Sequence, residues 1–63
     1  MRPIIRAGGK CIGYIRETSN GEELITPSGR LLGTYNESQD KTFRPGGGYF
    51  GNGNQLMCLL EDN

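Results

Sequence analysis

Three nine-residue segments of this chain align with one another without gaps, and this internal repeat restricts the possible folds more than any other feature of the sequence. The segments begin at Ile5, Ile25 and Phe43, so successive copies start 20 and then 18 residues apart. Each copy reads apolar, polar, Ala or Pro, Gly or Ser, Gly, a variable residue, two mainly apolar residues and Gly. Nine aligned positions in three copies are hard to obtain by chance, so the sequence predicts one structural unit that occurs three times.

Each copy has the pattern of a β-hairpin. Glycine adopts positive φ readily, and the Gly-Gly or Ser-Gly pairs at residues 8–9, 28–29 and 46–47 fit the two central positions of a primed turn. That register places an apolar residue opposite an apolar residue in every copy, as one buried face of a sheet requires. We therefore expect a shared core made of three facing pairs: Ile5 with Ile12, Ile25 with Leu32, and Phe43 with Phe50.

The same register places a glycine opposite residues 4, 24 and 42, at Gly13, Gly33 and Gly51 respectively. Glycine weakens a strand, and its presence there marks a bend or a close approach of another group. We therefore expect these three glycines to be equivalent in space and to tolerate no side chain.

The fold that these patterns predict is all-β, with a single domain over residues 1–63. No long segment has the 3.6-residue period of a helix, so we expect negligible helix. Turn signals in residues 20–21 and 36–38 predict that the hairpins follow one another directly. Leu56–Leu60 reads as a last strand that closes the sheet against residues 1–5. The expected result is a small closed meander or flower of three pseudo-symmetric repeats, approximately residues 3–22, 23–40 and 41–60.

The pattern Gly-x-apolar-Ile-Gly-Tyr-Ile in Gly9–Ile15, with its counterpart in Gly29–Tyr35, resembles the small bacterial β-flower proteins. In these hairpin-repeat families, four or five petals surround a pseudo-symmetry axis. The resemblance covers roughly Pro3 to Phe50, and the third copy departs from it at residues 51–54, which leaves the number of petals open. It implies a petal-like fold. It implies no function, since these families have no established biochemical role.

Composition narrows the function classes. With 63 residues the chain buries a small core, so self-association or a protein partner would add stability. The charges of seven basic and seven acidic residues cancel, and a neutral chain does not suit a nucleic-acid binder.

The sequence contains no His, and Cys11 and Cys58 lie far apart, so we expect no metal site and reduced thiols. Because no signal peptide or membrane span is evident, we expect a cytoplasmic protein of bacterial or phage type.

An enzyme is not expected. Without His, a nucleophile would need Lys, Asp or Glu as its base, and the acidic pair Glu22-Glu23 lies beside a turn where solvated charge is normal. Residues 46–51 formally match G-x-G-x-x-G, but a dinucleotide site requires a helix after that motif. We therefore expect no catalytic residues and no cofactor.

Two surfaces are candidates for binding. Arg6 and Arg44 occupy equivalent repeat positions, as do Lys10 and Arg30, and all four flank hairpin turns whose N–H groups could help to hold a small anion or a nucleotide. An apolar set on the strands, if it is exposed, would mark an interface with another protein. Its candidate residues are Ile15, Leu31, Tyr35 and Tyr49. The leading hypothesis is a non-enzymatic, self-associating protein-interaction module, and the alternative is a module that binds a small anion or a nucleotide at the basic turns.

Overall fold

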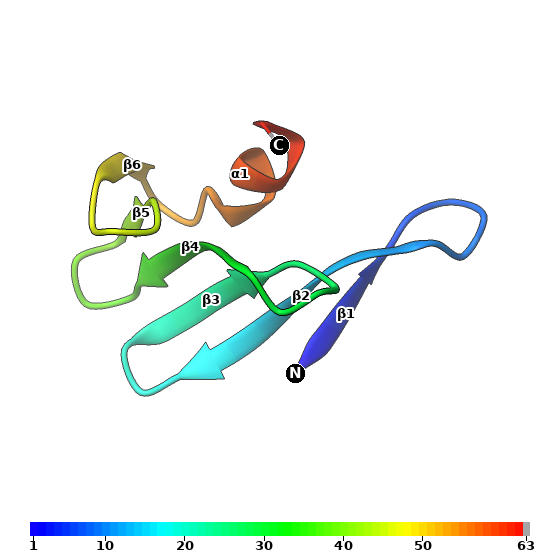
Figure 1. Cartoon of the computed structure of the whole chain (residues 1–63). Coiled ribbons are helices and arrows are strands. Elements are labelled where there is room, and N and C mark those ends of the chain that lie inside the picture. Colours follow the sequence, from blue (N-terminus) through cyan, green and yellow to red (C-terminus); the bar gives the residue numbers. More distant parts are fainter. Residues whose placement is uncertain (63) are drawn as a thin grey trace.

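The computed structural model describes residues 1–62 and contains one six-stranded antiparallel sheet and one helix (Figure 1). The elements are β1 (Arg2–Ile5), β2 (Cys11–Thr18), β3 (Gly21–Ile25), β4 (Leu31–Asn36), β5 (Lys41–Phe43), β6 (Tyr49–Asn52) and α1 (Leu56–Asp62). The strands are ordered in the sheet as they are in the chain, so the sheet is a meander. The all-β prediction is confirmed for the sheet. Among residues 1–62, no helix has the length and apolar composition needed to cross a membrane.

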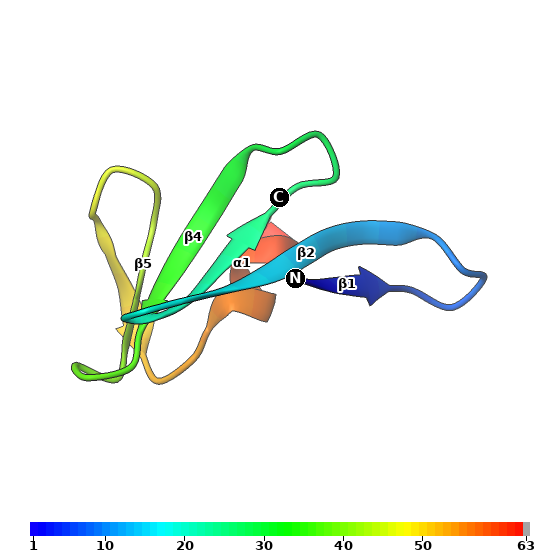
Figure 2. The same ribbon diagram turned by 90° about the horizontal axis from the view of Figure 1, so that it is seen from below.

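The predicted closure of the sheet is wrong, because β1 and β6 are the two edges of an open sheet. The segment expected to close it forms helix α1 instead, which packs on one face of the sheet against β4 and β3 (Figures 1 and 2). Leu56, Leu59 and Leu60 have the i, i+3, i+4 spacing that puts side chains on one face of a helix. A short apolar run fits a buried strand as well as a helix, so the sequence pattern alone did not decide between them.

A β-bulge in each of three hairpins changes the predicted pairing. The pairs Ile4–Gly13, Leu24–Gly33 and Thr42–Gly51 match the prediction. One step nearer the turn, the register shifts, and the observed pairs are Ile5–Cys11, Ile25–Leu31 and Phe43–Tyr49. The residue that the prediction had paired there (Ile12, Leu32 or Phe50) is the extra residue of the bulge.

The three hairpin turns are also one residue longer than predicted. In each, the last residue of a three-residue loop donates its N–H to the residue before the loop: Gly9 to Arg6 at 3.0 Å, Gly29 to Thr26 at 2.9 Å, and Gly47 to Arg44 at 3.0 Å. This last residue has a φ of 86°, 96° or 95°, which is typical of three-residue loops that end in a left-handed glycine. The predicted two-residue primed turns are therefore wrong, although the glycines do supply the positive φ.

The bulges divide the predicted core between the two faces of the sheet. We call the face covered by α1 the helix face and the other the open face. Leu32 is buried on the helix face, and Ile25 is buried on the open face, where it pairs with Leu31. Ile5 is 53% exposed, which contradicts its predicted place in the core, and Ile12, Phe43 and Phe50 are half-buried.

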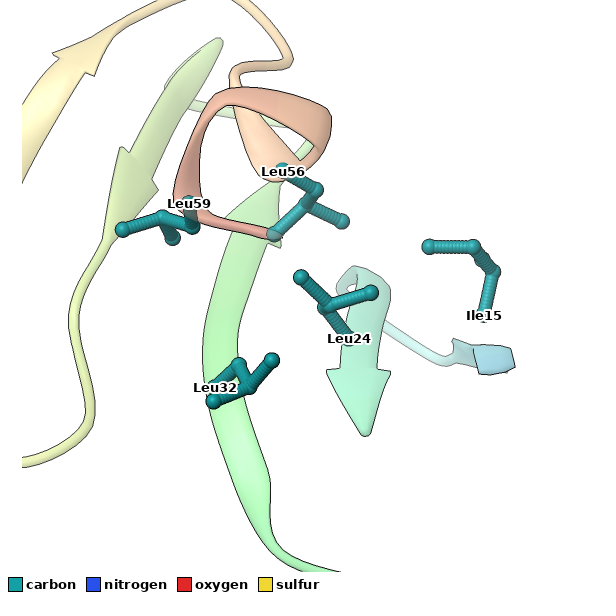
Figure 3. Packing of buried hydrophobic residues seen from close by; sticks show 5 residues of the cluster. All are labelled: Ile15, Leu24, Leu32, Leu56 and Leu59. Atoms are coloured by element: carbon teal, nitrogen blue, oxygen red, sulfur yellow. The ribbon is translucent and has the colours of Figure 1, made fainter. Parts of the chain in front are cut away.

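The core lies between the sheet and α1 (Figure 3). Leu56 and Leu59 of the helix pack against side chains of β2, β3 and β4, and four partly buried residues border this cluster: Ile4, Tyr35, Phe50 and Leu60. The buried cluster consists of Ile15, Leu24, Leu32, Leu56 and Leu59.

Gly33 is the glycine that lets the helix approach the sheet. A Cβ at this position would overlap Cδ1 of Leu59 and would lie 3.1 Å from the carbonyl oxygen of Phe43. At Gly13 the nearest atom would be the carbonyl oxygen of Ile25 at 3.2 Å, whereas at Gly51 it would be Cγ of Gln55 at 3.4 Å, an ordinary contact. The three glycines occupy the same position next to their bulges, but the prediction that all three tolerate no side chain is wrong for Gly51.

Candidate anion-binding pocket

A hollow of about 380 Å³ lies between the β1–β2 loop, the β3–β4 loop and helix α1. Three of its lining residues are basic, three are aliphatic and one is a threonine. The lining residues are Arg6, Lys10, Ile12, Thr26, Arg30, Leu32 and Leu60. Arg6, Lys10 and Arg30, three of the four residues predicted to bind an anion, are thus brought to one site.

The β1–β2 and β3–β4 hairpins hold these side chains in place by the same pattern of backbone hydrogen bonds. The N–H of Arg6 donates to the carbonyl of Lys10 at 2.9 Å, and the N–H of Thr26 donates to that of Arg30 at 2.8 Å. The second loop is fixed further, since the hydroxyl of Thr26 accepts the N–H of Arg30 at 2.9 Å and lies 2.9 Å from the hydroxyl of Ser28. The basic residues therefore start from well-defined positions at the ends of the strands.

The apolar part of the pocket comes from the bulges and the helix. Ile12 and Leu32 are the extra residues of two neighbouring bulges, and this places Leu32 on the helix face. Leu60 borders the core from α1 and also lines the pocket. The floor of the pocket is therefore a continuation of the hydrophobic core.

Three basic side chains line the pocket, and no Asp or Glu lines it among the residues whose side chains the structure describes. The acidic residues of β3 pair elsewhere: Glu22 accepts from Arg2 at 2.7 Å, and Glu23 accepts from Arg16. For the side chains of Lys10 and Arg30, the structure records no ion pair with any residue in the part of the chain that it describes. Guanidinium and ammonium groups that converge on one hollow attract carboxylate or phosphate oxygens.

Arg44, the fourth predicted residue, does not line this pocket. Its Cζ atom lies 4.8 Å from the centre of the Phe50 ring, over the bulge residue of its own hairpin. The third loop lies at the other end of the sheet from the first (Figure 1), and it carries Gly48 where the others carry Lys10 and Arg30. The basic turns therefore do not form one ring of four charges.

The predicted interface residues are divided between the two faces. Ile15 is 8% exposed and belongs to the core under α1. Tyr35 borders that core, and its hydroxyl donates to Asp40 at 2.7 Å. Leu31 and Tyr49 lie on the open face, where Leu31 is half-buried and Tyr49 is 56% exposed. The bulges cause this division, because an extra residue changes which side chains share a face.

Sequence reasoning missed four of the residues that line the pocket. Ile12 and Leu32 were assigned to the core, Leu60 was assigned to a closing strand, and Thr26 was not considered. The signal for the first two was present, since each copy has two consecutive residues that can pack on opposite faces, Cys11-Ile12 and Leu31-Leu32. The position of Leu60 in the pocket could be predicted only if residues 56–60 were recognised as a helix.

Among the described residues, no three His, Cys, Asp or Glu side chains lie together as metal ligands would. Cys11 and Cys58 are free thiols, half-buried and exposed respectively. The chain matches no family model, no curated protein and no solved structure. The resemblance to β-flower proteins therefore stays a prediction.

Proposed function

We propose that this protein is a non-enzymatic binding module that holds an anion in the pocket between its β1–β2 and β3–β4 loops. The observation that carries this proposal is that Arg6, Lys10 and Arg30 line one hollow. Arg6 and Lys10 come from the β1–β2 hairpin and Arg30 comes from the β3–β4 hairpin. The fold therefore brings together charges that are separated in the sequence.

The repeat gives this arrangement a simple origin. We propose that the three hairpins are copies of one unit, since they share their loop hydrogen bonds and the position of the bulge. The pocket then uses the same two positions from each of two neighbouring units: the residue after the loop (Lys10, Arg30) and the bulge residue (Ile12, Leu32). The third unit lacks the first of these, because Gly48 has no charge.

Thermal shift with anions tests the proposal. A ligand at ten times its dissociation constant stabilises the folded protein by about 1.4 kcal/mol, which raises the Tm of a domain of this size by roughly 10 °C. We expect such a rise with phosphate or with carboxylates, and we expect Lys10→Gln and Arg30→Gln to abolish it. The matched control is Arg44→Gln, which removes an equivalent charge outside the pocket and should leave the ligand-induced rise unchanged. No rise with any anion, or the same rise in Arg30→Gln, would contradict the proposal.

A second candidate function is self-association through the open face. Tyr14, Ile25 and Leu31 form one row across β2, β3 and β4, and Phe43 pairs with Tyr49 beside it. A small neutral chain gains stability by covering such a face with a second copy. We expect light scattering to show a dimer and Leu31→Lys to return it to a monomer. A monomer at high concentration would exclude this function and would leave the anion proposal unaffected.

A further inference from the structure

The proposed anion site has an apolar floor, and we infer that its ligand is an amphiphilic anion: a carboxylate or phosphate group attached to an aliphatic chain. This inference rests on the proposed function and specifies the class of ligand. Ile12, Leu32 and Leu60 line the same hollow as the three basic residues. An inorganic ion would engage the charges and leave the exposed parts of Ile12 and Leu60 facing water.

The lining also argues against a nucleotide. Protein sites for bases commonly use aromatic rings as stacking platforms. No Phe or Tyr lines this hollow. In the β5–β6 hairpin, the residue equivalent to Ile12 and Leu32 is aromatic, but this residue, Phe50, does not line the hollow, and Arg44 lies over its ring. The apolar surface of the pocket is aliphatic, which suits a flexible hydrocarbon chain.

The position of the floor indicates where the chain would lie. Leu60 borders the buried cluster between the sheet and α1, so the floor is the exposed margin of the core. The long side chains of Arg6, Lys10 and Arg30 are exposed and lie at the loops. A ligand would therefore place its charged group at the loops and its aliphatic chain along Ile12 and Leu60, with each methylene that it buries increasing the affinity roughly fourfold.

Four probes separate the contribution of the chain from that of the charged group: acetate, hexanoate, inorganic phosphate and hexyl phosphate. Titrations of the full chain, followed by NMR or calorimetry, give the four dissociation constants. Hexanoate carries four more methylenes than acetate, and burial of half of them corresponds to about a fifteenfold gain. We expect at least tenfold tighter binding for each ligand with a chain than for its short counterpart. The preferred head group distinguishes a carboxylate ligand from a phosphate ester.

Variants of the first hairpin complete the test. Ile12→Ala should weaken hexanoate and hexyl phosphate severalfold and leave acetate and phosphate unchanged. Ile5→Ala is the matched control, since Ile5 is exposed and does not line the pocket. Equal affinities with and without the chain, all lost in Lys10→Gln, would overturn the amphiphilic ligand while the anion-binding function stands. No binding by any of the four probes would overturn both.

Discussion

The N–H of Gln55 donates a 2.8 Å hydrogen bond to the hydroxyl of Thr42, a side chain with no exposed surface. The same hydroxyl donates to the carbonyl of Gly53 at 2.7 Å. Thr42 lies in β5, and the segment that it holds leads directly into α1, where Asn54 accepts the N–H of Leu56 at 3.2 Å. One buried hydroxyl thus fixes the start of the helix to the sheet.

Replacing Thr42 by Val should destabilise the protein by about 1–3 kcal/mol, because both backbone partners lose their hydrogen bond in a buried position. Chemical denaturation measures this loss. Thr34→Val is the matched control, since Thr34 is half-buried in the adjacent strand and no hydrogen bond of its side chain is recorded among the described residues. Equal stabilities of the two variants would show that the Thr42 bonds do not anchor the helix.

Truncating a helix leucine tests whether α1 completes the core. Leu56 is 1% exposed, so Leu56→Ala should cost about 2–5 kcal/mol, a large part of the stability of so small a domain. Met57, the next residue, is 50% exposed, and Met57→Ala should change the unfolding free energy by about 0.5 kcal/mol or less. A small loss in Leu56→Ala would mean that the helix is not packed on the sheet in solution.

Gly33→Val should destabilise the protein although valine is the better strand former. The backbone of Gly33 does not have positive φ, so the cost is steric and arises from the overlap with Leu59. Overpacking of this kind costs about 1–3 kcal/mol. In a double-mutant cycle, Leu59→Ala should cost less in a Gly33→Ala background than in the natural protein, because it removes the obstruction. A higher Tm for Gly33→Val would contradict the close approach of the helix.

Alkaline pH should weaken the contact between Tyr35 and Asp40. The hydrogen bond to Asp40 raises the pKa of Tyr35 above its ordinary value, and desolvation adds to this effect. A raised pKa in the folded state means that the stability is fully present below the unfolded value of about 10, and that it is lost as the pH rises through the folded value. The stability difference between the natural protein and Tyr35→Phe should therefore be constant to about pH 9 and shrink above pH 10.

Asp40→Asn provides the control for this pH dependence. Asp40 has a φ of 53°, which asparagine also adopts readily, and the amide oxygen can still accept the hydrogen bond. Removal of the charge should bring the folded pKa of Tyr35 closer to its unfolded value, so the alkaline loss of stability should become smaller. A difference between natural protein and Tyr35→Phe that stays the same from pH 7 to pH 12 would show that Tyr35 and Asp40 are not coupled.

The sequence repeat predicted which residues pair between strands, but not on which face of the sheet each side chain lies. The pairs Ile4–Gly13 and Leu24–Gly33 follow from counting outward from the glycine turns. The bulge was not predictable by that count, because residues 11–12 and 31–32 contain two successive side chains suited to packing, and either one satisfies an apolar position. Each bulge then moved one member of the predicted core pair to the opposite face.

The charged residues of the pocket were predictable from the sequence, but its aliphatic floor was not. Lys10 and Arg30 occupy equivalent repeat positions, and Arg6 flanks the same turn as Lys10, so these three charges could be recognised from the sequence. The exclusion of Arg44 follows from the openness of the sheet, which separates the third hairpin from the first. The aliphatic floor required the helix, and a run of five apolar residues does not distinguish a helix from a strand.

The most direct test of the proposed binding site is a map of backbone amide chemical-shift changes as hexyl phosphate is added to the full chain. We expect the changes to concentrate in residues 6–12 and 26–32 and at Leu60, while segment 44–50, which contains the β5–β6 loop, stays unchanged. Shift changes of equal size in all three hairpins, or changes centred on residues 44–50, would contradict this expectation.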